Sequence, residues 1–266
     1  MLKKNLNYFF LNAWLSMCTK STYRAASILK LCVNLFVTVL YICLWKAIYN
    51  GEGEINGFTL SDMLVYVFIS RILKNLYPYD ISRSYGELIK RGKIAILLLR
   101  PVRLELQLLS ASIGSALYDF CFCSLPTLFL LWFFIPPIPM GLVNFLQIIF
   151  WLFSSYAFIC LLELVVGTLS YYLQNLWGLN VFKSTMFTFL SGELLPIRFY
   201  PAFLLKLFEK LPFVAIYYVP VLLVLGKAVE EMKSYLAVLW VSCLILLVIY
   251  ILLSRKMIRH ITVQGG

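Results

Sequence analysis

Long apolar runs separated by short polar stretches dominate this chain and predict helices that cross a membrane. A spanning helix needs roughly 20 predominantly apolar residues. Six runs fall near that length: 25–49, 60–77, 107–134, 142–169, 179–195 and 235–253. Hydrophobic residues make up 62% of the chain and charged residues only 13%, which excludes an ordinary soluble domain. We therefore predict an all-α integral membrane protein with six spans, in a single transmembrane domain over residues 1–266.

The N-terminal segment differs from these runs because polar side chains recur on one face of the helix it predicts. Asn5, Asn12, Ser16 and Lys20 share that face, and aromatic and aliphatic residues cover the rest. The pattern is typical of an amphipathic helix lying in the membrane interface. A signal peptide is the alternative, but asparagines interrupt its apolar core and no A-x-A site follows. We expect an interfacial helix over residues 1–22.

Residues 191–232 interrupt the helical pattern with prolines at short intervals, including Pro196, Pro201 and Pro212. Each proline removes a backbone donor and favours a break or a first helical turn. The pieces between the breaks are shorter than the roughly 20 residues that a span needs. Broken backbone at membrane depth persists only where protein or a watery cavity satisfies its polar groups. We predict a re-entrant or surface-lying outer helical hairpin that caps a pathway before the last span.

Basic residues predict the orientation in the membrane. Of the 23 lysines and arginines, eight lie between residues 71 and 103, so the loop 78–103 is expected in the cytoplasm. Arg255, Lys256 and Arg259 fall on the same side after an even number of crossings. Both termini are then cytoplasmic in a multi-pass protein of the cell membrane. Because the basic residues flank apolar spans, the net charge of +11 reflects topology and not nucleic-acid binding.

A short amphipathic helix is predicted inside the 78–103 loop, where Asp80 can cap it and Gly92 can end it. One face carries the apolar positions Ile81, Tyr85, Leu88 and Ile89, and the charged positions Arg83, Glu87, Lys90 and Arg91 point elsewhere. A tethered amphipathic helix suits a groove on a cytoplasmic partner protein. Contact with anionic lipid headgroups is an equally open alternative.

Polar stripes follow two of the predicted spans at intervals of three or four residues, which places each stripe on one helical face. They consist of Tyr66, Ser70 and Lys74 on the second span and Asn180, Ser184, Thr188 and Ser191 on the fifth. Such stripes line translocation routes or, more often, form hydrogen bonds between helices. Residues 110–116 of the third span are rich in small side chains, which let helix backbones approach closely.

Two carboxylates lie inside predicted spans, Asp119 in the third and Glu163 in the fourth. Each costs a few kcal/mol when it faces lipid, so it must face the interior, pair with a cation or stay protonated. Lys183 and Lys74 are candidate partners, and the sequence does not decide which pairs form. A proton-coupled secondary transporter could use both carboxylates, which makes that class of carrier a rival hypothesis.

The residues that most catalytic and metal sites require are missing from the sequence. His260 is the only histidine, and the seven cysteines show no CxxC spacing. Histidine-dependent triads, zinc sites and a disulfide framework are therefore not indicated, which also weakens a lipid-modifying enzyme as a hypothesis. Val221 stands where a phosphate-binding loop ending at Gly226-Lys227 needs glycine. We expect a non-catalytic chain without metal or cofactor, so that any ATP and Mg²⁺ belong to another subunit.

Together these features resemble the membrane subunit of type-2 ATP-binding-cassette (ABC) exporters, across essentially the whole chain. The resemblance rests on the six spans, the interfacial helix, the short helix between the second and third spans, and the hairpin before the sixth. The most specific segments are Gly92 followed by LLLRP at 97–101, SGELLP at 191–196, FYP at 199–201 and LPF at 211–213. They are similar to a bacterial branch of small permeases, often encoded beside a second permease and an ATPase.

The resemblance implies an exporter or efflux system of the inner membrane with two six-helix permease subunits, identical or homologous, and two cytoplasmic ABC ATPase subunits. The helix at 80–91 would receive the motion of the ATPase, and the second and fifth spans would line the route at the subunit interface. An outer gate would contain Gly192, Glu193, Pro196, Pro201 and Pro212. The implied substrate is amphipathic or hydrophobic: a drug, lipid, peptide or glycan. Asp119 and Glu163 lie outside the family pattern.

Overall fold

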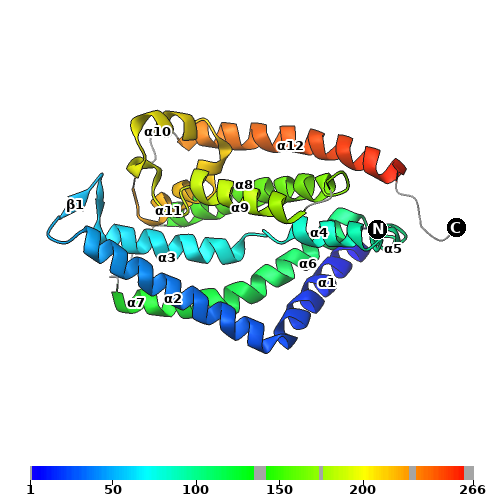
Figure 1. The fold of residues 1–266 in the computed structure, drawn as a ribbon, viewed down its shortest axis with the longest axis horizontal. Helices are drawn as coiled ribbons and strands as arrows, with labels where there is room; N and C mark the ends of the chain where they lie inside the picture. Colours follow the sequence, from blue (N-terminus) through cyan, green and yellow to red (C-terminus); the bar gives the residue numbers. More distant parts are fainter. Residues whose placement is uncertain (1, 135–141, 174–175, 228–231, 261–266) are drawn as a thin grey trace.

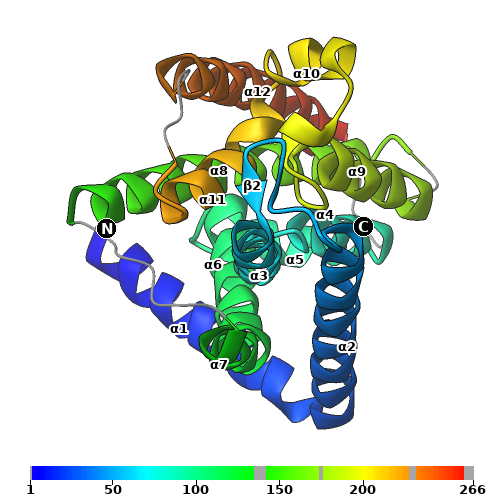
Figure 2. The same cartoon turned by 90° about the vertical axis from the view of Figure 1, so that its left-hand side faces the viewer.

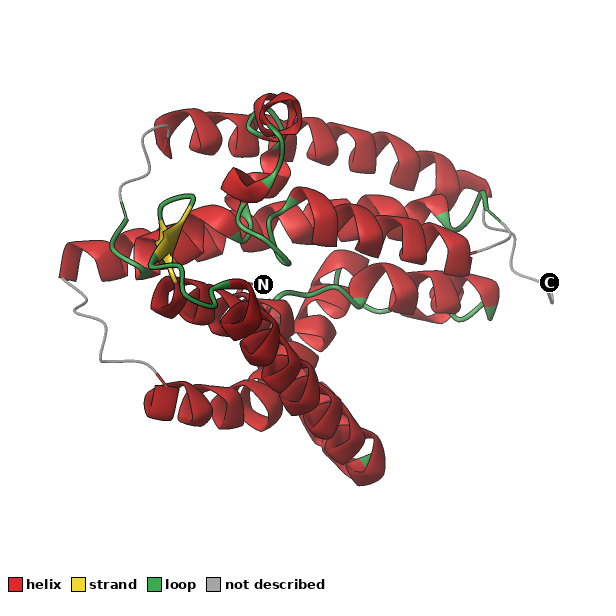
Figure 3. Cartoon of the chain, turned by 60° about the vertical axis from the view of Figure 1, so that its left-hand side comes forward, coloured by secondary structure: helices red, strands yellow, loops and turns green. Residues whose placement is uncertain are grey.

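The computed structural model describes residues 2–134, 142–173, 176–227 and 232–260, and it is built almost entirely of helices (Figures 1 and 3). The first half contains α1 (Leu2–Thr22), α2 (Arg24–Ile48), α3 (Leu60–Leu76), α4 (Ile81–Lys90), α5 (Ile94–Leu98), α6 (Leu104–Asp119), the π-helix η1 (Phe120–Ser124) and α7 (Leu125–Phe134). The second half contains α8 (Leu142–Leu169), α9 (Leu176–Leu190), η2 (Ile197–Phe199), α10 (Ala202–Phe208), η3 (Pro212–Ala215), α11 (Tyr218–Val224) and α12 (Met232–His260). Strands β1 (Glu54–Ile55) and β2 (Phe58–Thr59) form a short antiparallel hairpin between α2 and α3.

Within the described residues, four helical stretches are long and apolar enough to cross a membrane, which fits an all-α, multi-pass membrane protein. They are Arg24–Ile48, Leu104–Phe129, Asn144–Leu169 and Met232–Arg259. A bent pair, Ala202–Phe208 with Pro212–Val224, would make a fifth. Helices α3 and α9 have 17 and 15 residues, about 26 and 22 Å at 1.5 Å per residue, so the predicted six spans are not confirmed.

Sequence signals at both ends of α3 determine where this helix begins and ends. Thr59 and Asp62 form a capping box, in which the Thr59 hydroxyl accepts from the Asp62 amide and the Asp62 carboxylate accepts from the Thr59 amide. The helix stops just before Pro78, which disfavours helical backbone in the residue that precedes it. Figure 2 places α3 near the centre, with α8 and α9 on one side and α6 and α7 on the other.

Helix α1 forms as predicted but packs its polar face on α6. The Asn12 side-chain amide donates to the Gln107 carbonyl at 3.0 Å and to Ser110 Oγ at 2.7 Å. Gly114 permits this approach, because a Cβ there would lie 1.9 Å from the Ala13 carbonyl oxygen. The small side chains at 110–116 therefore do allow close helix packing. Large apolar residues such as Trp14 face outward, and the membrane-interface location of α1 stays a prediction.

Residues 202–224 of the predicted hairpin form two helical limbs bent by 78° at the break between Phe208 and Pro212. The second limb, η3 with α11, is buried between α8, α3 and α12, so it does not lie on the surface. Side chains satisfy its free carbonyls: Ser155 Oγ donates to Ala215 at 3.0 Å, and the Tyr77 hydroxyl donates to Ile216 at 2.8 Å. This is how broken backbone is tolerated inside a membrane protein. Residues 228–231 of the predicted hairpin lie outside the described residues.

The start of α1 and the end of α12 lie at the same end of the molecule, together with α4 and α5 (Figure 1). The β-hairpin and α10 lie at the opposite end. Lys227 reinforces that opposite end, since its ammonium forms an ion pair with Asp62 at 2.8 Å and donates to the Gly57 carbonyl. The basic loop 78–103 therefore lies at the same end as the start of α1 and the end of α12, and its cytoplasmic location stays a prediction.

Candidate functional site

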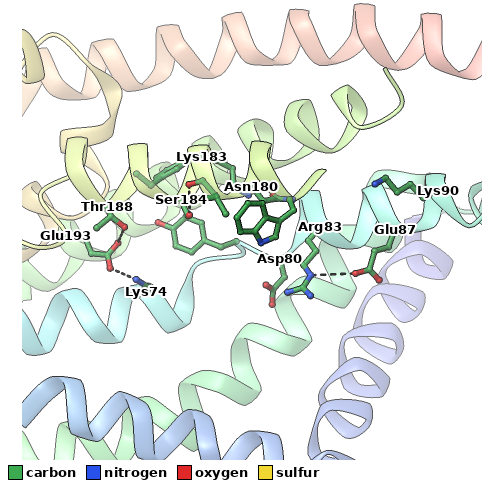
Figure 4. A pocket seen from close by; sticks show the side chains of 14 residues that line it. Lys74, Asp80, Arg83, Glu87, Lys90, Asn180, Lys183, Ser184, Thr188 and Glu193 are labelled. Carbon is green, nitrogen blue, oxygen red and sulfur yellow. Dashed lines mark hydrogen bonds and ion pairs between the residues drawn. The ribbon is translucent and has the colours of Figure 1, made fainter. Parts of the chain in front are cut away.

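A groove of about 640 Å³ lies between α9 and the segment that leads from the end of α3 into α4 (Figure 4). Its lining mixes aromatic, polar and charged side chains. They are Lys74, Tyr79, Asp80, Arg83, Glu87, Lys90, Trp177, Asn180, Val181, Lys183, Ser184, Phe187, Thr188 and Glu193. Burial raises the pKa of Tyr79, whose hydroxyl hydrogen-bonds that of Tyr217 at 2.9 Å, so the phenol is neutral.

The groove brings together residues from three features that are separate in the sequence. They are Lys74, Asn180, Ser184 and Thr188 from the polar stripes, Arg83, Glu87 and Lys90 from the short helix, and Glu193 from the hairpin. The other stripe members do not line it: Tyr66, Ser70 and Ser191 are buried in helix packing. Gly192, Pro196, Pro201 and Pro212 are also outside the lining.

Glu193 is placed at one end of the groove by the turn that ends α9. Gly192 adopts φ +76°, and a Cβ there would lie 2.9 Å from the Tyr66 hydroxyl, which donates to the Gly192 carbonyl. The turn directs the Glu193 carboxylate to Lys74 at 2.5 Å and to the Thr188 hydroxyl at 3.1 Å. One ion pair thus joins the ends of α3 and α9 across the groove.

The first turn of α4 is anchored to α8 and α9 by a buried polar network. Glu163 of α8 accepts the Ser82 amide at 2.9 Å and forms an ion pair with Lys183 of α9. Lys183 also donates to Ser82 Oγ at 2.7 Å, and Ser82 Oγ donates to the Asn180 side chain at 2.9 Å. The Glu163 carboxylate therefore caps α4 from another helix.

The predicted capping role of Asp80 is wrong. Its side chain makes no capping hydrogen bond, and its backbone lies in the helical region at φ −93° and ψ −6°. A capping side chain normally requires extended backbone at that position. The Asp80 carboxylate lines the groove instead.

The apolar face of α4 is covered by the chain itself. Ile81 and Tyr85 are 2% and 0% exposed, and Leu88 and Ile89 pack partly buried against the same cluster. Gly167 of α8 makes this packing possible, because a Cβ there would lie 2.5 Å from Tyr85 Cδ1. Burial raises the pKa of the Tyr85 phenol. Ile81 and Tyr85 are therefore not available to a partner protein, and coupling of this helix to an ATPase stays a prediction.

The outward face of α4 carries charge. Glu87 lies 3.6 Å from Arg83 and 3.7 Å from Arg91, in exposed ion pairs one turn apart. With Lys90, these side chains give the face a net charge of +2, three cations against one anion. Any partner that docks on α4 from outside meets this charged face and not the apolar one.

A family model for the ABC-2 family transporter protein matches residues 35–264, most of the chain. The chain belongs to the ABC-2 transporter family. It is a permease subunit of an ABC transporter, and the family implies pairing with an ABC ATPase. Such permeases are membrane transport subunits and are generally non-catalytic. No match was found among curated proteins or among solved structures.

The two intramembrane carboxylates of the permease have different partners. Glu163 pairs with Lys183, one of the two candidate lysines, whereas Lys74 pairs with Glu193. Asp119 pairs with Lys20 at the end of α1 and with Lys30 on α2, both at 2.6 Å. Neither carboxylate lines the groove.

Sequence reasoning missed Ser82, Lys20 and Lys30 as members of these networks. Lys30 carried a signal, since it is one of two lysines inside the apolar run 25–49. Ser82 carried no such signal, because a serine early in a helix is common.

In the part of the chain that the structure describes, no group of three or more histidine, cysteine or acidic side chains could hold a metal ion.

Proposed function

We propose that this permease forms half of an ATP-driven export pathway and that the groove along α9 is its share of the route. The supporting observation is that the groove joins the polar stripe of α9, the end of α3 and the outward face of α4. A ligand in the groove would contact the helix that ATPase binding would move. The proposed substrate route and the helix that the ATPase would move are therefore adjacent within one subunit.

The outward face of α4 is proposed as the docking surface for the ATPase. It lies at the end of the molecule that holds the start of α1 and the end of α12, which we propose is the cytoplasmic face of the cell membrane. The Ser82 network ties α4 to α9, so a push on α4 would reach residues 180–183 beside the groove. ATP and Mg²⁺ would be bound by two ATPase subunits and not by this chain.

A second permease subunit, identical or homologous, is proposed to close the groove. The flank of the groove exposes apolar side chains, with Trp177 75% and Phe182 64% exposed. The hairpin around Gly192, Glu193, Pro196, Pro201 and Pro212 would form the outer gate. Aromatic and charged groups together suit an amphipathic substrate, such as a drug, lipid, peptide or glycan.

The rival proposal, a proton-coupled carrier that uses Asp119 and Glu163, has weaker geometric support. Both carboxylates are ion-paired with lysines and lie outside the groove lining. Transport that persists without ATP, and that is lost in Asp119→Asn and Glu163→Gln variants that remain folded, would favour the carrier.

We expect Ser184→Trp to lower transport about tenfold, the effect of a steric penalty of ~1.4 kcal/mol. Ser184 lines the groove and is exposed there, so the indole would occupy space needed by substrate. Uptake into inverted vesicles, with the ATPase present, measures the effect. Thr185→Trp is the matched control, since Thr185 is exposed but not in the lining. Equal transport by both variants would remove the groove from the route.

Reversing charge on α4 should weaken copurification of the ATPase. Arg83→Glu with Arg91→Glu changes the outward face from +2 to −2, so a partner surface complementary to the native face would repel it. We expect about a tenfold loss of coupled ATPase, with folding stability changed by less than ~0.5 kcal/mol because both arginines are exposed. Lys206→Glu with Lys210→Glu, at the opposite end, should retain the ATPase.

This experiment separates two failures. If wild-type permease copurifies with the ATPase and the α4 variant does so equally well, the docking surface is wrong but the permease function stands. If the wild type copurifies with no ATPase and transport needs no ATP, the proposed function itself is wrong.

A further inference from the structure

An unbalanced charge cluster lies where α1, α2 and α6 meet, remote from the groove lining. One oxygen of Asp119, Oδ2, receives the ammonium groups of Lys20 and Lys30, each at 2.6 Å. The cluster holds two cations and one anion, so its net charge is +1. Lys20 also donates to Ser115 Oγ at 3.1 Å. Among the described residues, no other carboxylate forms an ion pair with either lysine.

The surroundings of this cluster are apolar and face outward. On α2, Leu29 precedes Lys30 and Val33 follows one turn later, and these two side chains are 65% and 53% exposed. On α1, Trp14 and Leu15 are exposed as well. In a multi-pass membrane protein such surfaces contact lipid. An unpaired cation that faces lipid has a high free-energy cost. An anion from outside the chain would lower this cost by neutralising the net charge of the cluster.

The two lysines are not equally enclosed. The Asp119 side chain is 8% exposed, the Lys20 side chain 27% and the Lys30 side chain 45%. Asp119 is therefore occupied by the chain, whereas Lys30 has an open side from which a second anion can approach. A lysine ammonium has three donors, and the carboxylate uses one of them.

We propose that Lys20 and Lys30, held by Asp119, bind the phosphate of an anionic phospholipid headgroup. The acyl chains would lie along the exposed apolar side chains of α2, and the headgroup would neutralise the cluster. Attraction between basic side chains and anionic lipid is worth ~1 kcal/mol per residue at the membrane surface. The bound lipid would then brace α1 and α2 against α6.

The test uses the full-length permease, purified in detergent and mixed with phosphatidylglycerol or phosphatidylcholine, with retained lipid counted by native mass spectrometry. We expect wild type to prefer phosphatidylglycerol and Lys30→Gln to lose that preference by about fivefold, the effect of one basic residue. Lys30→Arg keeps the charge and should retain the preference. Lys256→Gln is the matched control, because Lys256 is an exposed lysine on α12, away from the cluster.

Three outcomes would overturn the proposal. Lys30→Gln could keep the wild-type preference for phosphatidylglycerol, or Lys256→Gln could lose that preference equally. In a thermal-unfolding measurement on the wild-type permease, inorganic phosphate alone could raise the melting temperature as much as phosphatidylglycerol does. The last result would identify a site for a free anion. If Lys30→Gln fails to fold, Lys20→Gln answers the same question, since it also reduces the cluster to a single cation and a single anion.

Discussion

Replacing Glu163 with glutamine should destabilise the folded permease by about 3–5 kcal/mol, because it leaves a buried cation without its counterion. Glu163 is fully buried, and Lys183, its partner, is 8% exposed. Glutamine still accepts the Ser82 amide, so the loss isolates the ion pair from the capping hydrogen bond. Thermal unfolding in detergent, followed by intrinsic fluorescence, measures the change.

The control for Glu163 is Glu87→Gln, which removes the carboxylate of the exposed pairs on α4 and should cost less than ~1 kcal/mol. A double variant, Glu163→Gln with Lys183→Met, removes both charges and should recover much of the lost stability. If the single and double variants unfold at the same temperature, the pair is not the source of the effect.

Replacing Gly114 with alanine should destabilise the permease by about 1–3 kcal/mol by overpacking the contact between α1 and α6. The added Cβ would meet backbone, with the Ala13 carbonyl oxygen at 1.9 Å, so no side chain can rotate away to make room. Helix α1 must shift, which stretches the Asn12 hydrogen bonds to Gln107 and Ser110. The melting temperature measures the loss.

Gly178→Ala is the matched control, because Gly178 lies within α9 and a Cβ there meets nothing within 4 Å. Alanine favours helix over glycine by about 1 kcal/mol, so this variant should be neutral or stabilising. A loss at both positions would indicate a general sensitivity of the permease to substitution and would argue against the close approach at Gly114.

The helices of the permease could be predicted from the sequence because hydrophobic length and proline position are local signals. The break at Pro212 and the short helix before Gly92 fall where those signals place them. The number of spans could not be predicted in the same way. Helices α3 and α9 carry apolar patterns near the limit of spanning length, and composition alone does not decide such cases.

The candidate site was only partly predictable, because its contacts join residues far apart in the chain. The Glu163 and Lys183 pair was among the candidates, but the capping of Ser82 by Glu163 joins positions separated by 81 residues. The α4 helix shows the same limit. Periodicity identified its apolar face correctly, yet could not say that α8 would cover that face through Gly167. Pattern defines a surface, and only tertiary structure defines what covers it.

The buried limb at 212–224 has a consequence for how the permease is made. It lies between α3, α8 and α12, and its carbonyls are held by Tyr77 and Ser155 from the earlier helices. Helices α3 and α8 precede the limb in the chain and α12 follows it. The interior of the permease is therefore complete only after the last third of the chain has been synthesised.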